Sequence, residues 1–322
     1  MKLRKVATLE VFPTKPFNFD ATFHKPAHFP SGDTFWESGV NWHTYFWQDK
    51  QIGLKFVDAG GKNKPSVTVE VYYSNELTSQ FLESLKKELV YRYNLDLDLS
   101  DFYAQFKNDS VLKKPIKRLY GMRPGHAGSL YEHLVIGIIL QNTFVKKSVQ
   151  MLQALFENYG KLLEYNNKSL WAFWQPGGLE EVAEDDLRRL KLGYRAKSIK
   201  KIDDAFRLGQ VDELALRGLD LETQKKELLK IYGVGPATVW YLLFDVFHQY
   251  NFFNYISPWE QKIYSKLFFD RDPEDPMEVN ELIKYFDRFG KYKQLAVHYI
   301  WEDLWWKRKN ESIPWLEKLI RL

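Results

Sequence analysis

The hydrophobic and polar positions of the chain follow two different periods, one in its first quarter and the other in the rest. From Phe17 to about Tyr73 they alternate, as in strands that bury one face, and the clearest runs are NWHTYFWQDKQIGLKFV and PSVTVEVYY. The intervening DAGGKNKP has the residue types of a turn. This first segment is therefore predicted to form a small antiparallel sheet.

From Leu77 onward the spacing of apolar residues changes to that of helices. In SLYEHLVIGIILQ, for example, Leu130, Leu134 and Ile138 fall on one face. Clusters of Gly and Pro separate such segments and predict short turns between helices. The pattern predicts an α+β protein, with an antiparallel β domain at residues 1–95 and a core that is nearly all helix at residues 96–322. No flexible linker is evident, so we expect the two parts to pack directly on each other.

Composition narrows the classes of function. The 322 residues include no cysteine, which excludes disulfides, thiolate zinc sites, cysteine nucleophiles and cysteine-ligated iron–sulfur clusters. A net charge of +4 is a mild basicity that hardly predicts an anionic partner by itself. No segment approaches 18 uncharged apolar residues, and the N-terminus lacks the apolar run of a signal peptide. We expect an intracellular protein of the cytoplasm or nucleoid, without a membrane partner.

The stretch LLKIYGVGPATVWYLLFDVF predicts two helices joined by a tight turn. Gly233 and Gly235 suit a turn that needs positive φ or close backbone approach, and Pro236 suits the first turn of the second helix. Such a turn exposes backbone N–H groups at a helix N-terminus, where they and the helix dipole can bind a phosphate oxygen. Taken alone, the stretch favours an ordinary helical hairpin whose glycines serve packing.

Three further stretches accompany this turn. All four resemble stretches of the helix-hairpin-helix superfamily of DNA glycosylases, in which they follow one another in the same order along the chain. GVGPAT followed by an apolar helix resembles the hairpin itself. Residues 96–160 resemble the run that precedes the hairpin in 3-methyladenine DNA glycosylase II. LRRLKLGYRAKSIKKI resembles a segment of that family and of 8-oxoguanine DNA glycosylase, and FGKYKQLAVHYIWEDLWW resembles their last helix. The resemblance implies a helical glycosylase core with the hairpin at residues 222–249.

The resemblance also implies roles for residues that would touch DNA. Asn142 stands where these enzymes insert a side chain into the base stack, and Tyr194 and Arg195 match residues that contact the unpaired partner strand. The alternatives are a helix C-cap for Asn142 and ordinary packing for Tyr194. The remaining expected DNA-binding residues belong to the hairpin or to the segment after Tyr194; they are Gly233, Gly235, Thr238 and Lys197.

Aromatic and basic residues supply further candidates. Aromatic rings stack on any base, and the candidates for a base pocket are Trp171, Trp174, Trp301 and Trp305, although core packing is the expected role for at least half of them. Basic residues collect in VLKKPIKRLYGMR and RRLKLGYRAKSIKK. These runs either bind phosphates, with an affinity that falls with salt, or form solvated charged faces.

One residue of the superfamily is missing. Its members carry an aspartate at the start of the helix after the hairpin, where the carboxylate opposes an oxocarbenium-like transition state. This chain has ISPWEQK there, and the expected aspartate falls on Ser257, or on Pro258 if the register slips by one. Ser257 and Glu260 have the spacing of a capping box, with Pro258 at the first helical position. Glu260 could instead turn toward the pocket and replace the aspartate.

A second departure concerns the lysine that bifunctional members use for strand cleavage, because its position here is Ala237. The function hypothesis is therefore a monofunctional DNA glycosylase of base excision repair that acts as a monomer on double-stranded DNA with a damaged, alkylated or oxidised, base. We expect neither a metal nor another cofactor, and a monovalent cation at the hairpin is left open. The alternative is a protein that binds lesions or DNA structures and has lost the chemistry.

Overall fold

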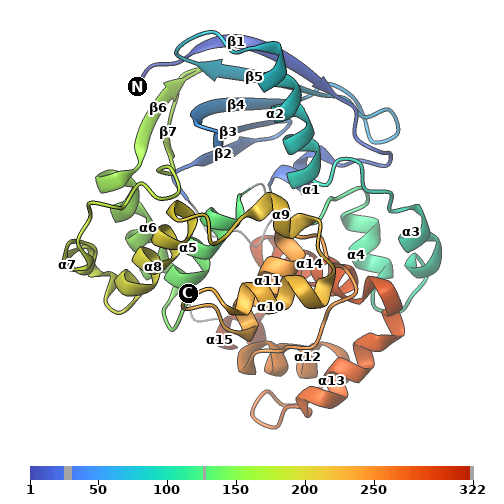
Figure 1. Cartoon of the computed structure of the whole chain (residues 1–322). Coiled ribbons are helices and arrows are strands. Elements are labelled where there is room, and N and C mark those ends of the chain that lie inside the picture. Colours follow the sequence, from blue (N-terminus) through green and yellow to red (C-terminus); the bar gives the residue numbers. More distant parts are fainter. Residues whose placement is uncertain (25–30, 126–127, 320–322) are drawn as a thin grey trace.

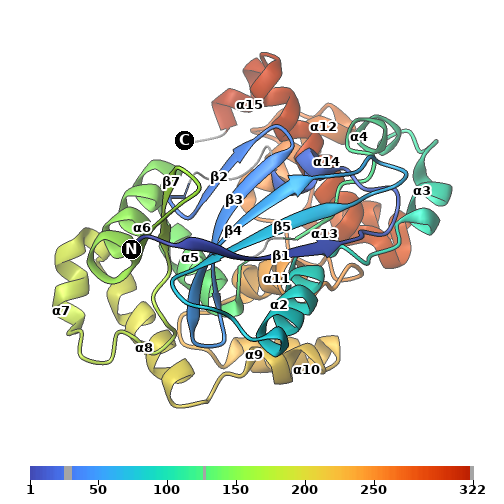
Figure 2. The same ribbon diagram turned by 90° about the horizontal axis from the view of Figure 1, so that it is seen from above.

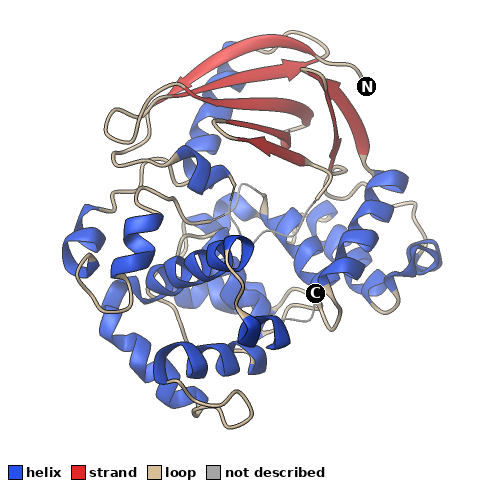
Figure 3. Cartoon of the chain, turned by 180° about the vertical axis from the view of Figure 1, so that it is seen from behind, coloured by secondary structure: helices blue, strands red, loops and turns tan. Residues whose placement is uncertain are grey.

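The computed structural model describes residues 1–24, 31–125 and 128–319. Strands gather at one end of the molecule and helices fill the rest, as Figures 1 and 3 show. The α+β class expected from the sequence is therefore confirmed. Within the described residues, no helix is both long enough and apolar enough to cross a membrane.

Five strands form an antiparallel sheet in the order β1-β5-β4-β3-β2, and Figure 2 looks down on this sheet with the helices behind it. The strands are β1 (Arg4–Val11), β2 (Thr34–Glu37), β3 (Val40–Trp47), β4 (Lys50–Asp58) and β5 (Val67–Tyr73). Alternation along β4 turns Ile52, Leu54 and Phe56 to one face, where all three are fully buried. The helix that follows β5 packs on this face, so the sheet has a core of its own.

A second, smaller sheet differs from the sequence-based expectation. Strands β6 (Lys161–Tyr165) and β7 (Lys168–Ala172) form a hairpin inside the segment that was expected to be nearly all helix. Asn166 and Asn167 form its two-residue turn with φ of 46° and 60°, which asparagine tolerates better than most residues. Tyr165 packs on the second face of the large sheet at Gly53, where a Cβ would lie 2.7 Å from the tyrosine ring. The expectation was wrong here because strands of five residues contain too few periods to be told from helix.

The rest of the described chain is mainly helical. The first seven helices are α1 (Phe19–Phe23), α2 (Ser79–Arg92), α3 (Ser100–Phe106), α4 (Lys113–Arg118), α5 (Leu130–Leu140), α6 (Val145–Tyr159) and α7 (Glu184–Leu187). They are followed by α8 (Arg195–Arg207), α9 (Glu213–Arg217), α10 (Leu221–Leu229), α11 (Pro236–Asp245), α12 (Pro258–Phe269), α13 (Val279–Phe286), α14 (Lys293–Asn310) and α15 (Pro314–Leu319).

Helices α5 and α11 run antiparallel and set the position of the site. Near one end of the contact, a Cβ built on Gly137 of α5 would lie 3.5 Å from the Thr238 methyl of α11. Further along, the rings of His133 and Tyr241 lie 5.4 Å apart. Residue numbers therefore fall along α5 as they rise along α11. The loop that follows α5 consequently lies at the same end as the turn that precedes α11.

A buried ion cluster, which we define as Glu88, Arg92, Glu213 and Arg217, joins α2 to α9. Glu88 is 4% exposed and accepts from Arg92 Nε at 2.5 Å and from Arg217 Nη1 at 2.7 Å. Glu213 also accepts from the backbone N–H of Leu130 at 2.7 Å. Because Leu130 is the first residue of α5, the cluster holds the N-terminal end of that helix against the sheet domain.

A candidate active site beside the helical hairpin

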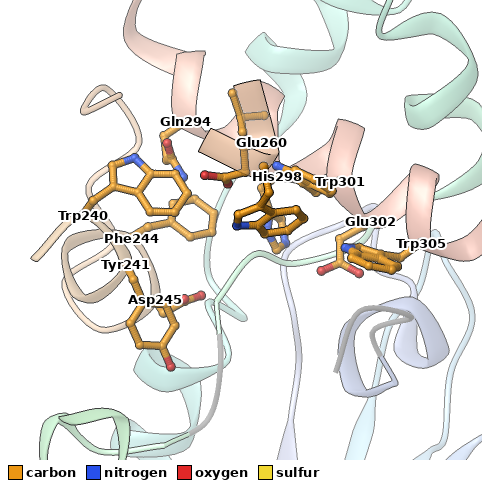
Figure 4. A pocket seen from close by; sticks show the side chains of 12 residues that line it. Trp240, Tyr241, Phe244, Asp245, Glu260, Gln294, His298, Trp301, Glu302 and Trp305 are labelled. Atoms are coloured by element: carbon orange, nitrogen blue, oxygen red, sulfur yellow. The ribbon is translucent and has the colours of Figure 1, made fainter. Parts of the chain in front are cut away.

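Three helices converge on a pocket of about 210 Å³, and Figure 4 shows its side chains. This volume is below the roughly 300–1,000 Å³ of sites for drug-sized ligands, so the pocket suits a single ring system. Its lining comes from α11, the first turn of α12 and α14, and consists of Trp240, Tyr241, Phe244, Asp245, Trp259, Glu260, Gln294, Val297, His298, Trp301, Glu302 and Trp305.

Tryptophan rings form one side of this pocket. The ring centroids of Trp259 and Trp301 lie 5.4 Å apart, and those of Trp301 and Trp305 lie 5.9 Å apart with planes only 23° from parallel. The indole N–H of Trp301 donates to the hydroxyl of Tyr264, which fixes the middle ring. Trp259 is 44% exposed and therefore faces solvent at the pocket. An aromatic wall of this kind can stack on a planar ligand.

Glu260 both caps α12 and lines the pocket. Its Oε2 accepts from the backbone N–H of Ser257 at 2.9 Å and from the Ser257 hydroxyl at 2.6 Å, which confirms the capping box expected from the sequence. Among the described residues no donor bonds to Oε1. Burial raises the pKa of Glu260, and the hydrogen bonds from Ser257 only partly offset this effect. The two roles that the sequence presented as alternatives are therefore compatible, because they use different oxygens.

Two more carboxylates line the pocket and were missed from the sequence. Asp245 on α11 is 7% exposed, and Glu302 on α14 is 4% exposed. The negative charge of Asp245 contributes, after burial, to the raised pKa of the Tyr241 hydroxyl. Sequence reasoning passed over both residues because a lone acidic residue in an apolar helix has no motif of its own.

A helical periodicity on α14 could have identified much of the pocket. Its lining residues follow the pattern i, i+3, i+4, i+7, i+8, i+11 and so share one face of the helix; they are Gln294, Val297, His298, Trp301, Glu302 and Trp305. The stripe mixes aromatic and polar side chains, whereas a stripe that faces the core is apolar. This mixture is the signal that the sequence contained.

The turn before α11 has the conformation that the sequence indicated. Gly233 has φ of +83°, and a Cβ there would lie 2.9 Å from the Ser198 hydroxyl, so this position requires glycine. A Cβ at Gly235 would meet only open space. Within the part of the chain that the structure describes, the backbone N–H groups of Gly233, Gly235, Ala237 and Thr238 have no acceptor. Tyr232, beside them, is 48% exposed. The turn therefore offers a row of free donors at the surface.

Several other expected DNA-binding residues lie at the same end of the molecule. Gln141 Nε2 donates to the Gly233 carbonyl at 2.9 Å, which ties the loop after α5 to the hairpin turn. The next residue, Asn142, is exposed and donates to the Tyr194 hydroxyl at 3.2 Å. The Lys197 ammonium lies 5.6 Å from the centre of the Tyr232 ring. These contacts bring the loop after α5, the start of α8 and the turn onto one exposed surface, here called the hairpin surface.

Two expected DNA-binding side chains are occupied by protein. Arg195 is 8% exposed, and its guanidinium donates to the backbone carbonyl of Gln141. The methyl group of Thr238 packs toward Gly137 on α5. Arg195 thus holds the Asn142 loop in place, and Thr238 fixes the crossing of two helices.

The four tryptophans proposed for a base pocket do not lie together. Trp301 and Trp305 line the pocket, whereas Trp171 and Trp174 do not. Trp174 is 4% exposed, and its indole N–H donates to the hydroxyl of Tyr131 at 2.6 Å. Trp171 lies on β7, where its ring is parallel to that of Phe156. Trp171 therefore packs against α6 and Trp174 against α5, whereas Trp301 and Trp305 remain the candidates for a base pocket.

Among the described residues, no group of three or more His, Cys, Asp and Glu side chains is placed to hold a metal ion.

Comparisons with known proteins give a consistent result. No family model matches the chain. DNA-3-methyladenine glycosylase of Bacillus subtilis is 28% identical over 199 residues, which cover 58% of this chain and 66% of the relative, slightly less than two thirds. The 3-methyladenine DNA-glycosylase from Archaeoglobus fulgidus superposes with a TM-score of 0.74 at 16% identity, over 94% of this chain and 100% of that chain.

A second solved structure contains DNA. The Clostridium acetobutylicum 8-oxoguanine glycosylase/lyase, in complex with double-stranded DNA containing cytosine opposite 8-oxoG, superposes with a TM-score of 0.69 at 20% identity, over 96% of this chain and 98% of that chain. The chain has the fold of these glycosylases. The resemblance to the helix-hairpin-helix DNA glycosylases noted in the sequence is confirmed.

Proposed function

We propose that the chain is a monofunctional DNA glycosylase of base excision repair, which flips a damaged base out of duplex DNA and hydrolyses its N-glycosidic bond. The observation that carries this proposal is Glu260, which lines an aromatic pocket one helix away from the hairpin turn and whose Oε1 accepts from no donor among the described residues. The shared fold and the resemblance to glycosylases support it.

Binding begins at the hairpin surface. The free N–H groups of Gly233 and Gly235, at the positive end of the α11 dipole, hold a phosphate of the lesion strand. Lys197 adds a phosphate contact, and Asn142 enters the gap that the flipped base leaves. Trp240 lies four residues beyond Pro236 on α11, which is about 6 Å along the helix axis. A base flipped beside the turn therefore has a short path to the pocket.

Cleavage uses the pocket wall and its carboxylate. The departing base stacks on Trp301, and the bond between C1′ and the base nitrogen breaks with its electron pair going to the base. The cation that develops at the sugar faces Oε1 of Glu260. Water then attacks C1′ and loses a proton, which leaves an abasic site. An N-alkylated purine, which is cationic, leaves as a neutral base and needs no proton. Such bases are therefore the favoured substrates.

Ala237 replaces the lysine of bifunctional glycosylases, so the enzyme releases the base without forming a Schiff base at this position. A gel assay should accordingly show an intact strand until alkali cleaves the abasic site.

Single-turnover base release from a panel of lesion duplexes tests the proposal. Glu260→Gln should lower the rate about 100-fold or more, because it removes a preorganised charge, and should leave duplex affinity unchanged. Lys5→Gln, on the distant sheet, is the matched control and should release base at the wild-type rate. Equal release by wild type and Glu260→Gln would overturn the assignment of Glu260.

A second candidate function is a lesion-binding protein without catalysis, and Ser257, where the superfamily carries an aspartate, favours it. This alternative is supported if the wild type binds a lesion duplex selectively but releases no base. Release that then appears in the double variant Ser257→Asp/Glu260→Gln would identify the missing carboxylate as the reason.

A further inference from the structure

Two polar atoms in the pocket wall have no hydrogen-bond partner among the residues that the structure describes. Gln294 is 2% exposed, and its Oε1 is buried without a donor. The indole nitrogen of Trp240 is buried without an acceptor. Both side chains line the pocket that contains Glu260, and Figure 4 shows them on the same side of it.

The position of Gln294 is fixed by its backbone. Its N–H donates to the carbonyl of Tyr250 at 2.9 Å, at the start of α14. Neighbouring residues on the buried face of this helix, such as Leu295 and Ala296, are at most 1% exposed. The amide group of this 2% exposed residue therefore lies in the pocket wall and away from solvent, although a half-turn about its last bond would exchange the oxygen and the nitrogen.

A second buried glutamine shows that the fold can satisfy such a group. Gln224 is 1% exposed; its Nε2 donates to the carbonyl of Leu216 at 3.1 Å, and its Oε1 accepts from Gln249 at 2.9 Å. Gln294 has neither kind of partner among the described residues. Because an unsatisfied buried polar group destabilises a protein, a wall that contains both an unpaired acceptor and an unpaired donor points to a ligand with the complementary edge.

We propose that Gln294, assisted by the Trp240 N–H, is a specificity-determining residue that reads the hydrogen-bonding edge of the flipped base. The proposal rests on the proposed function, because it assigns the same pocket to a base. A side-chain amide pairs with an edge that offers a donor beside an acceptor, as the amino group and ring nitrogens of adenine do. Stacking on Trp301 accepts any base and cannot discriminate. The preferred substrate is therefore a purine whose edge keeps its N–H donor.

Equilibrium dialysis with free bases tests this without DNA or catalysis. Two pairs of ligands are compared, adenine with N6,N6-dimethyladenine and hypoxanthine with 1-methylhypoxanthine, since methylation removes the edge donor and keeps the rings. The wild type should bind the parent of at least one pair about tenfold more tightly. Gln294→Leu should bind both members of that pair equally. Gln150→Leu, an exposed residue on α6, is the control and should keep the preference.

Trp240→Phe provides a second variant if Gln294→Leu does not fold, as judged by thermal melting. It should weaken the binding of the parent base more than that of its methylated partner. The proposal is overturned if the wild type binds no free base or binds both members of each pair equally. It is also overturned if the preference survives in Gln294→Leu or, where that variant does not fold, in Trp240→Phe, because the preference would then be steric.

The two proposals can fail separately. Base release from lesion duplexes by a wild type without edge preference would leave the glycosylase assignment in place and reject the role of Gln294. Edge preference for free bases without release from any duplex would support the role of Gln294 and reject the glycosylase assignment.

Discussion

The ion cluster beneath the sheet and the pocket beside the hairpin each enclose a glutamate, but the two glutamates have opposite surroundings. Burial by itself raises the pKa of Glu88, but the hydrogen bonds and charges of Arg217 and Arg92 outweigh it and hold this pKa below its ordinary value. Among the described residues no arginine or lysine forms an ion pair with Glu260, and burial raises its pKa.

The difference separates structural residues from candidate functional residues. Every oxygen of Glu88 has a guanidinium partner, so the cluster is complete without a ligand. The pocket and the hairpin surface contain free groups of several kinds, namely a carboxylate oxygen, a buried amide and a row of backbone donors. Unsatisfied groups that gather in one place indicate where a partner molecule binds.

Replacing the glutamate of each region should produce the largest difference in the free energy of unfolding. Glu88→Gln leaves the buried guanidinium of Arg92 and the partly buried one of Arg217 without a full counter-charge and should lower the free energy of unfolding by about 3–5 kcal/mol. Glu260→Gln keeps its cavity filled, and a glutamine oxygen can still accept from the Ser257 N–H, so the change should stay below about 1 kcal/mol. Urea unfolding of both variants measures the contrast, and similar losses would erase the distinction.

The two glycines of the hairpin turn offer a smaller but cleaner test. Gly233→Ala adds a methyl group against Ser198 at a positive φ and should lower the free energy of unfolding by roughly 1–2 kcal/mol. Gly235→Ala should change it by less than about 0.5 kcal/mol, because its Cβ meets open space. In a filter-binding assay, however, Gly235→Ala should weaken duplex binding, since the methyl group stands where a phosphate approaches. Normal duplex affinity in Gly235→Ala would show that the turn does not hold DNA.

The pH dependence of stability should have opposite signs in the two regions. The pKa of Glu88 is lowered on folding, so its stabilising contribution is present above its ordinary value of 4.5 and is lost as the pH falls. The pKa of Glu260 is raised, so ionisation of this carboxyl in the folded protein destabilises it as the pH rises above that value. Relative to wild type, Glu260→Gln should therefore become more stable as the pH rises. Thermal melting of the wild type, Glu88→Gln and Glu260→Gln across the acidic range measures the sign of each contribution.

The smallest expected effect concerns single surface charges. Lys197→Gln on the hairpin surface should weaken duplex binding a few-fold and lower the slope of log affinity against log salt by about one. Lys5→Gln should change neither, because Lys5 lies on the sheet and pairs with Glu70 at 2.7 Å. A fluorescence titration at several salt concentrations distinguishes them, and an unchanged slope for Lys197→Gln would place that residue outside the interface.

Local signals in the sequence predicted the local features of the site. The spacing of Ser257, Pro258 and Glu260 was sufficient to predict the cap of α12, because a capping box involves only neighbouring residues. The glycines at 233 and 235 likewise predicted the turn. Both inferences needed no knowledge of how distant segments pack.

Features that depend on packing were not predictable in the same way. Trp171 and Trp301 are both tryptophans near glycosylase-like motifs, yet only Trp301 reaches the pocket, because β7 turns the ring of Trp171 toward Phe156 of α6. The partners of Gln294 and Gln224 also depend on tertiary contacts. The polar side chains can be read from the sequence, but which of them lack hydrogen-bond partners follows only from the fold.

Because Glu260 both caps α12 and lines the pocket, it limits which residues position 257 can accept. An aspartate introduced at position 257 would stand beside the carboxylate that already bonds to that residue, and two like charges at such a distance resist ionising together. A single Ser257→Asp substitution is thus opposed by Glu260, and the introduced aspartate ionises more readily if the glutamate is replaced as well.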